Sequence, residues 1–172
     1  ADAQTYYRKL ADPIGNKQAP LEILDIGCGT GLEIPALLKA APNARLTCLD
    51  LSAEMLHQLE SKFPNQAIRL IKASYLVYDF GEALYDVVLS SMTLHHLPPK
   101  KKLGLYRKIF RCLKPHALYI EGDYVVSDEK MVHLLADYDV HADLVDAGKY
   151  HIDIPLSLDR QIDLLSRAGF VE

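Results

Sequence analysis

One stretch near the N-terminus constrains the fold of this chain more than any other. An apolar run over residues 21–26 is followed by a glycine at every second position, Gly27, Gly29 and Gly31, and a helix-like apolar pattern begins at Leu32. This order predicts a buried strand, a tight turn and a helix. Glycine reaches backbone angles that other residues avoid, and a helix N-terminus offers unpaired N–H groups. The stretch therefore predicts a turn that holds a nucleotide-like ligand.

The spacing of these glycines narrows the choice of ligand. Dinucleotide-binding turns carry G-x-G-x-x-G, whereas this chain has G-x-G-x-G. A phosphate-binding P-loop would end in G-K-[ST], which this turn lacks. NAD, FAD and nucleoside triphosphates are thus disfavoured, and a nicotinamide-dependent oxidoreductase is the least favoured class of enzyme. A tight turn that binds no ligand is the alternative.

An acid at the end of the next apolar run supports a ribose site. The run covers residues 45–51, and Asp50 lies about 20 residues after Gly31. An acid at this separation, at the end of the second strand, accepts hydrogen bonds from the ribose hydroxyls. Ser52 is placed to cap a helix that we expect over 53–63.

Several segments together resemble the class I S-adenosylmethionine (SAM)-dependent methyltransferases. The matching segments follow the order of that family and cover nearly the whole chain: 25–31, 49–52, 86–91, 94–97 and 113–115. The resemblance implies an α/β fold, a Rossmann-like doubly wound and mostly parallel sheet in the strand order 3-2-1-4-5, flanked by helices. It specifies the superfamily but no particular substrate.

The chain pattern agrees with such a fold. Apolar runs and helical periodicity predict strands over 21–26, 45–50, 68–73, 85–90 and 118–123, and helices over 4–12, 32–40, 53–63, 100–113, 127–149 and 158–168. We expect a single domain over 1–172, with an N-terminal helix and loop to about residue 20 and a lid insertion over about 124–156. The last two strands of the family fold are missing, so we expect a fragment, or a missing part outside this sequence.

The resemblance also implies a SAM site, with S-adenosylhomocysteine as the product. The residues assigned to this site are Asp25, Gly27, Cys28, Gly29, Gly31, Asp50, Leu51, Met55, Ser74, Tyr75 and Ser91. Asp25 would fix the turn or contact the methionine ammonium through water, and Asp50 would hold the ribose. Ser74 stands where the family often has an acid for the adenine amine. Leu51 and Met55 would pack on the adenine, and helix core is the alternative for Met55.

Two adjacent histidines after the fourth strand are the candidates for catalysis. Imidazole titrates near neutral pH, so it suits removal of a proton from a methyl acceptor. His96 is the first candidate and His95 the second, while a role in loop orientation or pocket shape is the alternative. His151 and Asp153 are weaker candidates from the predicted lid.

Charge and cysteine content exclude some functions. The net charge is −4, which gives no strong nucleic-acid signal, and we expect the run 100–102 of three lysines to be solvated. The three cysteines lie far apart without metal-ligand spacing, and two of them fall at predicted buried strand or turn positions. We therefore expect structural thiols in a reducing compartment and no metal site. No long apolar stretch or signal peptide is visible. We expect a cytoplasmic protein without a membrane partner, and a homodimer stays open.

The favoured function is methyl transfer from SAM to a small-molecule acceptor by in-line displacement. The acidic charge balance and the predicted lid favour this acceptor class. One alternative is a tRNA or protein methyltransferase, which would need a basic surface or a further recognition domain. Another is a non-catalytic protein that binds SAM or stabilises a partner.

Overall fold

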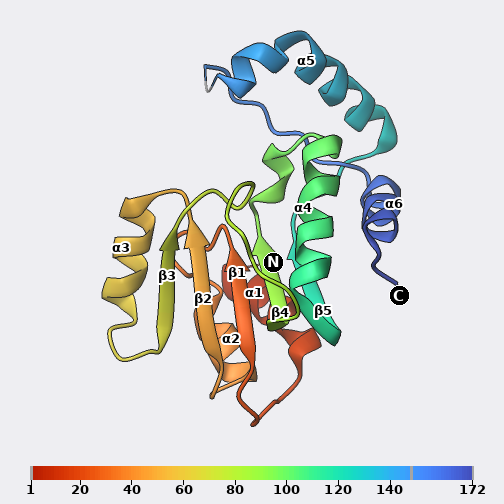
Figure 1. The fold of residues 1–172 in the computed structure, drawn as a ribbon. Helices are drawn as coiled ribbons and strands as arrows, with labels where there is room; N and C mark the ends of the chain where they lie inside the picture. Colours follow the sequence, from red (N-terminus) through yellow and green to blue (C-terminus); the bar gives the residue numbers. More distant parts are fainter. Residues whose placement is uncertain (1, 148, 172) are drawn as a thin grey trace. The chain divides into compact units, whose positions relative to one another are not determined.

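A parallel sheet of five strands organises the first part of the chain (Figure 1). The computed structural model describes residues 2–147 and 149–171. The order is β3-β2-β1-β4-β5, and every neighbouring pair is parallel. The strands are β1 (Glu22–Ile26), β2 (Arg45–Asp50), β3 (Ile68–Lys72), β4 (Tyr85–Ser91) and β5 (Leu113–Gly122). The fold class and strand order expected from the sequence are confirmed.

The chain divides into two compact units, each of which is described by itself. The first comprises the described residues up to Ser91 and Arg111–Gly122, and the second comprises Met92–Phe110 and the described residues from Asp123 onward. The first unit holds α1 (Ala3–Ala11), the 3-10 turn η1 (Asp12–Ile14), α2 (Ile34–Ala40) and α3 (Ala53–Lys62). The second holds η2 (Leu94–His96), α5 (Asp128–Asp146), α6 (Leu158–Ala168) and most of α4 (Pro99–Cys112).

The core of the first unit follows from alternation along its central strands. Ile23 of β1, Cys48 of β2 and Leu89 of β4 are fully buried and pack with Leu37 of α2 and Leu59 of α3. In a strand, residues two apart face the same side of the sheet, so every second apolar residue reaches this core. All three cysteines are buried free thiols, although the sequence predicted buried positions for only two of them.

The helix ends follow the local signals of the sequence. The Ser52 hydroxyl accepts from the backbone N–H of Met55 at the start of α3. The Ser157 hydroxyl caps α6 in the same way, and Gly169 ends that helix in the left-handed region with φ of 112°. The predicted cap at Ser52 is confirmed, because capping depends on a few adjacent residues.

The predictions for α4 and the lysine run need two corrections. The helical spacing of the apolar residues in 100–113 predicts that Tyr106, Ile109 and Phe110 all belong to the core. Tyr106 and Ile109 are fully buried, but Phe110 is half exposed and lies edge-on to Phe170. Lys102 is buried rather than solvated, and its Nζ donates to Gln161 Oε1 at 2.8 Å. The sequence shows three equivalent lysines, whereas the helix turns only the third into the interior of the second unit. Among the described residues, no helix is both long and apolar enough to cross a membrane.

Strand β5 begins at Leu113, five residues before its predicted start. Tyr85 pairs with Leu113 and Val87 with Leu118, so the register shifts where the sequence predicted a turn. His116 lies in this irregular stretch with φ of 62°, a left-handed angle. Extra residues in one strand form a bulge, which accommodates the turn within the strand.

The angle at His116 leads to a prediction about stability. We expect His116→Gly to be more stable than His116→Ala by about 1 kcal/mol, because a side chain costs roughly 1–2 kcal/mol in this region and the freedom of glycine in the unfolded chain offsets part of the gain. Urea unfolding of the two variants measures the difference. An alanine variant as stable as the glycine variant would contradict a left-handed His116.

Candidate functional site

The glycine turn joins β1 to α2 at the carboxyl end of the sheet. Its three glycines all have positive φ, at 71°, 50° and 71° for Gly27, Gly29 and Gly31. A Cβ on Gly31 would lie 2.7 Å from Ile34 Cδ1, so packing against the first turn of α2 requires glycine there. A Cβ on Gly29 would meet no atom within 4 Å. Gly29 is thus the open point of the turn, where a ligand can approach the backbone.

Asp50 ties the glycine turn to the end of β2. Its Oδ2 accepts from the backbone N–H of Gly29 at 2.9 Å, and its Oδ1 accepts from the N–H of Ser52 at 2.8 Å. An ionised carboxylate has about four lone-pair positions, so it can accept further hydrogen bonds from a ligand. The structure therefore brings the predicted ribose acid and the predicted glycine turn together.

The residues predicted to lie near adenine come from two neighbouring segments of the first unit. Leu51 and Met55 are 69% and 41% exposed, so Met55 does not belong to the helix core. Ser74 follows β3, and its Oγ accepts from the Leu76 N–H at 3.3 Å. Tyr75 is partly buried beside it. Asp79, further along the same loop, accepts from the Gly81 N–H at 3.0 Å.

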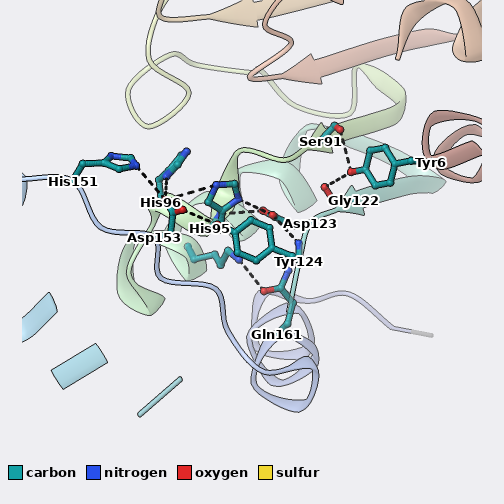
Figure 2. Close-up of polar contacts among 11 residues, drawn as sticks. Tyr6, Ser91, His95, His96, Gly122, Asp123, Tyr124, His151, Asp153 and Gln161 are labelled. Carbon is teal, nitrogen blue, oxygen red and sulfur yellow. Dashed lines mark hydrogen bonds and ion pairs between the residues drawn. The ribbon is translucent and has the colours of Figure 1, made fainter. Parts of the chain in front are cut away.

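Ser91 lies where β4 ends, in contact with the N-terminal helix (Figure 2). Its hydroxyl oxygen is 3.2 Å from the Tyr6 hydroxyl, which donates to the Gly122 carbonyl at 2.7 Å. Tyr6 thus joins α1 to the carboxyl ends of β4 and β5. An aromatic residue therefore docks the N-terminal helix onto the sheet.

Two buried carboxyl groups lie beneath the turn. Asp25 and Glu33 are 1% and 5% exposed, and both Asp25 oxygens and Glu33 Oε1 are buried without a hydrogen-bond partner of good geometry. Burial and the neighbouring Glu33 raise the pKa of Asp25 well above its ordinary value, and burial also raises the pKa of Glu33. Sequence reasoning missed Glu33, because an acid after a turn is ordinarily solvated.

A second polar cluster forms within the other unit. Asp123 holds His95 in place, since its Oδ2 accepts from the His95 backbone N–H at 3.0 Å and its Oδ1 lies 2.7 Å from His95 Nδ1. Both side chains are at least nine-tenths buried. A carboxylate only accepts, so Nδ1 carries the proton and Nε2 keeps its lone pair in the neutral imidazole.

The other members of this cluster surround one oxygen of Asp153 (Figure 2). Asp153 Oδ1 lies 3.0 Å from His96 Nδ1, 3.2 Å from His151 Nε2 and 3.9 Å from His95 Nε2. The Tyr124 hydroxyl donates to the other carboxylate oxygen at 2.8 Å. The structure thus brings together all four residues that the sequence named around the histidine pair.

The electrostatics of the cluster follow from these contacts. Burial, together with the charge of His95, lowers the pKa of His96 and favours its neutral form. Burial acts to raise the pKa of Asp153, but the Tyr124 hydrogen bond and the histidines lower it overall. Burial and Asp153 raise the pKa of Tyr124 to about 12. These two shifts favour a neutral His96 imidazole beside an ionised Asp153 carboxylate.

Sequence reasoning missed Asp123 and Tyr124. Both follow directly after β5, at the carboxyl end of a parallel strand, where ligand-binding residues of open α/β folds gather. That position was the available signal. Their partners His95 and Asp153 lie 28 and 29 residues away, so the pairing itself is not visible in the sequence.

A cavity of about 460 Å³ lies at the amino-terminal ends of the strands, opposite the glycine turn. It is lined by the loop after α1, by Asp86 and Val87 of β4, and by the bulge of β5. Ligands of open α/β sheets bind at the carboxyl ends of the strands, so this cavity is distinct from the glycine turn.

Comparison with known proteins identifies the family. The profile of a family described as a methyltransferase domain matches residues 23–116, more than half of the chain. The chain belongs to this family. The sheet order and the relatives place it in the class I SAM-dependent methyltransferase superfamily, as the resemblance implied.

Relatives and solved structures agree with this assignment. An uncharacterized methyltransferase of Mycobacterium tuberculosis is 31% identical over 99 residues, which are 56% of this chain and 47% of that protein. A carboxy-S-adenosyl-L-methionine synthase of Nautilia profundicola is 24% identical over 165 residues, covering 88% of this chain and 70% of that protein. The structure of a SAM-dependent methyltransferase from Mesorhizobium loti shares the fold, with a TM-score of 0.73, 19% identity, and coverage of 99% of this chain and 82% of that one. The chain therefore spans about half the length of the mycobacterial methyltransferase.

The raised pKa of Glu33 predicts that neutralising this carboxyl group stabilises the protein more at high pH than at low pH. Because the folded pKa of Glu33 is raised above its ordinary 4.5, the folded protein holds more protons than the unfolded chain and loses stability as pH rises above that value. Glu33→Gln removes this loss. We expect its free energy of unfolding, relative to the wild type, to be higher at pH 8 than at pH 5 in urea titrations. The same difference at both pH values would contradict a raised pKa.

Proposed function

We propose that this protein binds SAM on the glycine turn and transfers its methyl group to a small-molecule acceptor. The observation that carries the proposal is the contact between Asp50 and the N–H of Gly29 at the carboxyl ends of β2 and β1. This is where open α/β sheets hold their ligands. In a chain of the methyltransferase domain family, this contact supports a role for the glycine turn and Asp50 as the SAM site.

The residues of the first unit fit SAM. The free lone pairs of Asp50 suit the two ribose hydroxyls, and the space over Gly29 admits a ligand close to the backbone. The buried oxygens of Asp25 have no hydrogen-bond partner, so they suit the methionine ammonium, directly or through water. Exposed Leu51 and Met55 offer apolar surface to adenine, and the Ser74 hydroxyl offers a polar contact.

When bound, SAM supplies a methyl group on a positively charged sulfur, which leaves as a neutral thioether. The protein then has to align the acceptor, exclude water and remove a proton where the acceptor carries one. We propose His96 and then His95 for the proton, because His96 is largely neutral and partly exposed. Asp123 would hold His95 in the tautomer whose Nε2 accepts.

Two observations support a small-molecule acceptor. The net charge of −4 does not favour the phosphate backbone of a nucleic acid. The name of the Nautilia relative, carboxy-S-adenosyl-L-methionine synthase, also refers to a small molecule. We therefore propose screening hydroxyl, amine and carboxylate acceptors of low molecular weight before macromolecules.

Asp50 provides the test of the cofactor site. We expect Asp50→Ala to weaken SAM binding at least tenfold, because a hydrogen bond from a neutral group to a charged one contributes about 1.5–3 kcal/mol. Asp86→Ala is the matched control. Asp86 is an acid of the same sheet, but it lies at the amino-terminal ends of the strands, where it accepts from the Glu22 N–H and from Lys114. Calorimetric titration with SAM and a thermal melt of each variant are the measurements. Equal SAM affinity in the two variants would remove Asp50 from the site.

His96 provides the test of the reaction. We expect His96→Ala to lower turnover with a responsive acceptor about 100-fold or more while SAM affinity changes little, since general-base catalysis contributes about 10²–10⁴-fold. Turnover is measured by formation of S-adenosylhomocysteine, and SAM affinity by calorimetry. Parallel loss of turnover and SAM affinity would point to a structural role for His96.

A further inference from the structure

We propose that His95, His96 and Asp153 form a binding site for one divalent transition-metal ion of the Zn²⁺ class. One ligand atom from each of these residues can be chosen so that all lie within 4.8 Å of one another. Two imidazoles and one carboxylate form a donor set that suits zinc and other late first-row ions, whereas Mg²⁺ and Ca²⁺ prefer oxygen ligands alone. All three residues lie in the second unit.

The distances within the cluster are close to those that a tetrahedral ion requires. Zinc lies about 2.0–2.1 Å from nitrogen and oxygen ligands, which places neighbouring ligand atoms about 3.3 Å apart. Asp153 Oδ1 is 3.0 Å from His96 Nδ1 and 3.9 Å from His95 Nε2. Changes of about 0.3 Å and 0.6 Å would bring these two distances to that value, and all three ligand atoms already lie within 4.8 Å of one another. His151 Nε2, at 3.2 Å from the same oxygen, is close enough to join as a further ligand.

Two atoms at the centre of the cluster lack satisfactory partners. His96 Nδ1 and Asp153 Oδ1 are both buried without a hydrogen bond of good geometry, although they lie 3.0 Å apart. Buried polar atoms in native proteins nearly always have a partner. A bound cation would satisfy both atoms at once, because each would direct a lone pair toward it.

The surroundings of His95 match those of a metal-binding histidine. Its Nδ1 donates to the buried Asp123 carboxylate at 2.7 Å, which leaves Nε2 as the free lone pair on the side of Asp153. Histidine ligands commonly have such a carboxylate behind them, where it fixes the tautomer and the ring orientation. Asp123 is therefore a positioning residue for the metal ligand. The Tyr124 hydroxyl does the same for Asp153, since it donates to Oδ2 and leaves Oδ1 for the ion.

The cluster is open on one side. The side chains of His96 and Asp153 are 39% and 44% exposed, whereas that of His95 is 7% exposed. Three protein ligands leave a coordination position for water or another small oxygen ligand, as in catalytic zinc sites. If the proposed methyl transfer holds, an acceptor with a hydroxyl or carboxylate oxygen would take this position, and the ion would lower the pKa of a hydroxyl.

Metal binding is tested without SAM or acceptor, so the result does not depend on the proposed function. The metal-free full chain is titrated with Co²⁺, followed by absorption in the visible range, and then with Zn²⁺ in competition. We expect one Co²⁺ per chain with the intense bands of tetrahedral coordination, displacement by Zn²⁺, and no competition from Mg²⁺. Absence of saturable binding by the folded wild type would overturn the proposal.

Variants locate the site. We expect His96→Ala and Asp153→Asn each to weaken Zn²⁺ binding at least 100-fold, and Asp123→Asn to weaken it about 10–100-fold through His95. His141→Ala is the matched control, because His141 also pairs with an aspartate, Asp137 at 3.2 Å, but lies on α5 outside the cluster. Circular dichroism melts verify that each variant is folded. Zn²⁺ binding that is equal in His141→Ala and in the folded cluster variants would place the ion elsewhere and overturn the proposal.

Discussion

The carboxylate of Asp50 connects the parts of the first unit on which ligand binding depends. One oxygen accepts from the Gly29 N–H in the turn after β1, and the other accepts from the Ser52 N–H before α3. The Asp50 carbonyl also accepts from the Ala73 N–H after β3, at 3.0 Å. One residue thus sets the positions of three loops at the carboxyl edge of the sheet. The turn is preorganised before a ligand arrives, so little of the binding free energy is lost to ordering it.

His95 plays a comparable part in the second unit. Its backbone N–H and its ring both bond to Asp123, and its carbonyl accepts from the Ile154 N–H at 2.6 Å. Three segments far apart in the sequence are therefore fixed around one buried imidazole. The polar atoms that remain, on His96, His151 and Asp153, then converge because their own backbones are held. Metal and catalytic sites are commonly built from imidazole and carboxylate groups that are held in place without a full set of hydrogen-bond partners.

Local signals explain which parts of this fold the sequence predicted. The strands around the glycine turn are continuous apolar runs, and the caps at Ser52 and Ser157 depend on residues three positions away. The predicted sheet order came from the family resemblance, and the structure confirms it. The start of β5 was wrong by five residues, because the bulge at His116 is stabilised by pairing with β4 rather than by its own residue types.

The sequence analysis failed mainly at charged residues that are buried against partners distant in the sequence. Lys102 looked like its exposed neighbours, but its amine reaches Gln161 in α6, 59 residues away. Glu33 was overlooked because nothing near it in sequence shows that it will lie beside Asp25. The sequence named His96 and His95 as catalytic candidates and His151 and Asp153 as weaker ones, but it did not predict that they form one cluster, because these side chains meet only after folding. Burial of charge is a tertiary property, and one sequence gives no direct measure of it.

The most direct test of the central claim is a calorimetric titration of the wild-type chain with SAM, with S-adenosylhomocysteine and NAD in parallel. The assembled turn and Asp50 predict saturable binding of SAM and its demethylated product at one site per chain, and no binding of NAD. A folded chain that binds NAD in preference to SAM, or binds neither SAM nor its product, would contradict the assignment of the glycine turn as a SAM site.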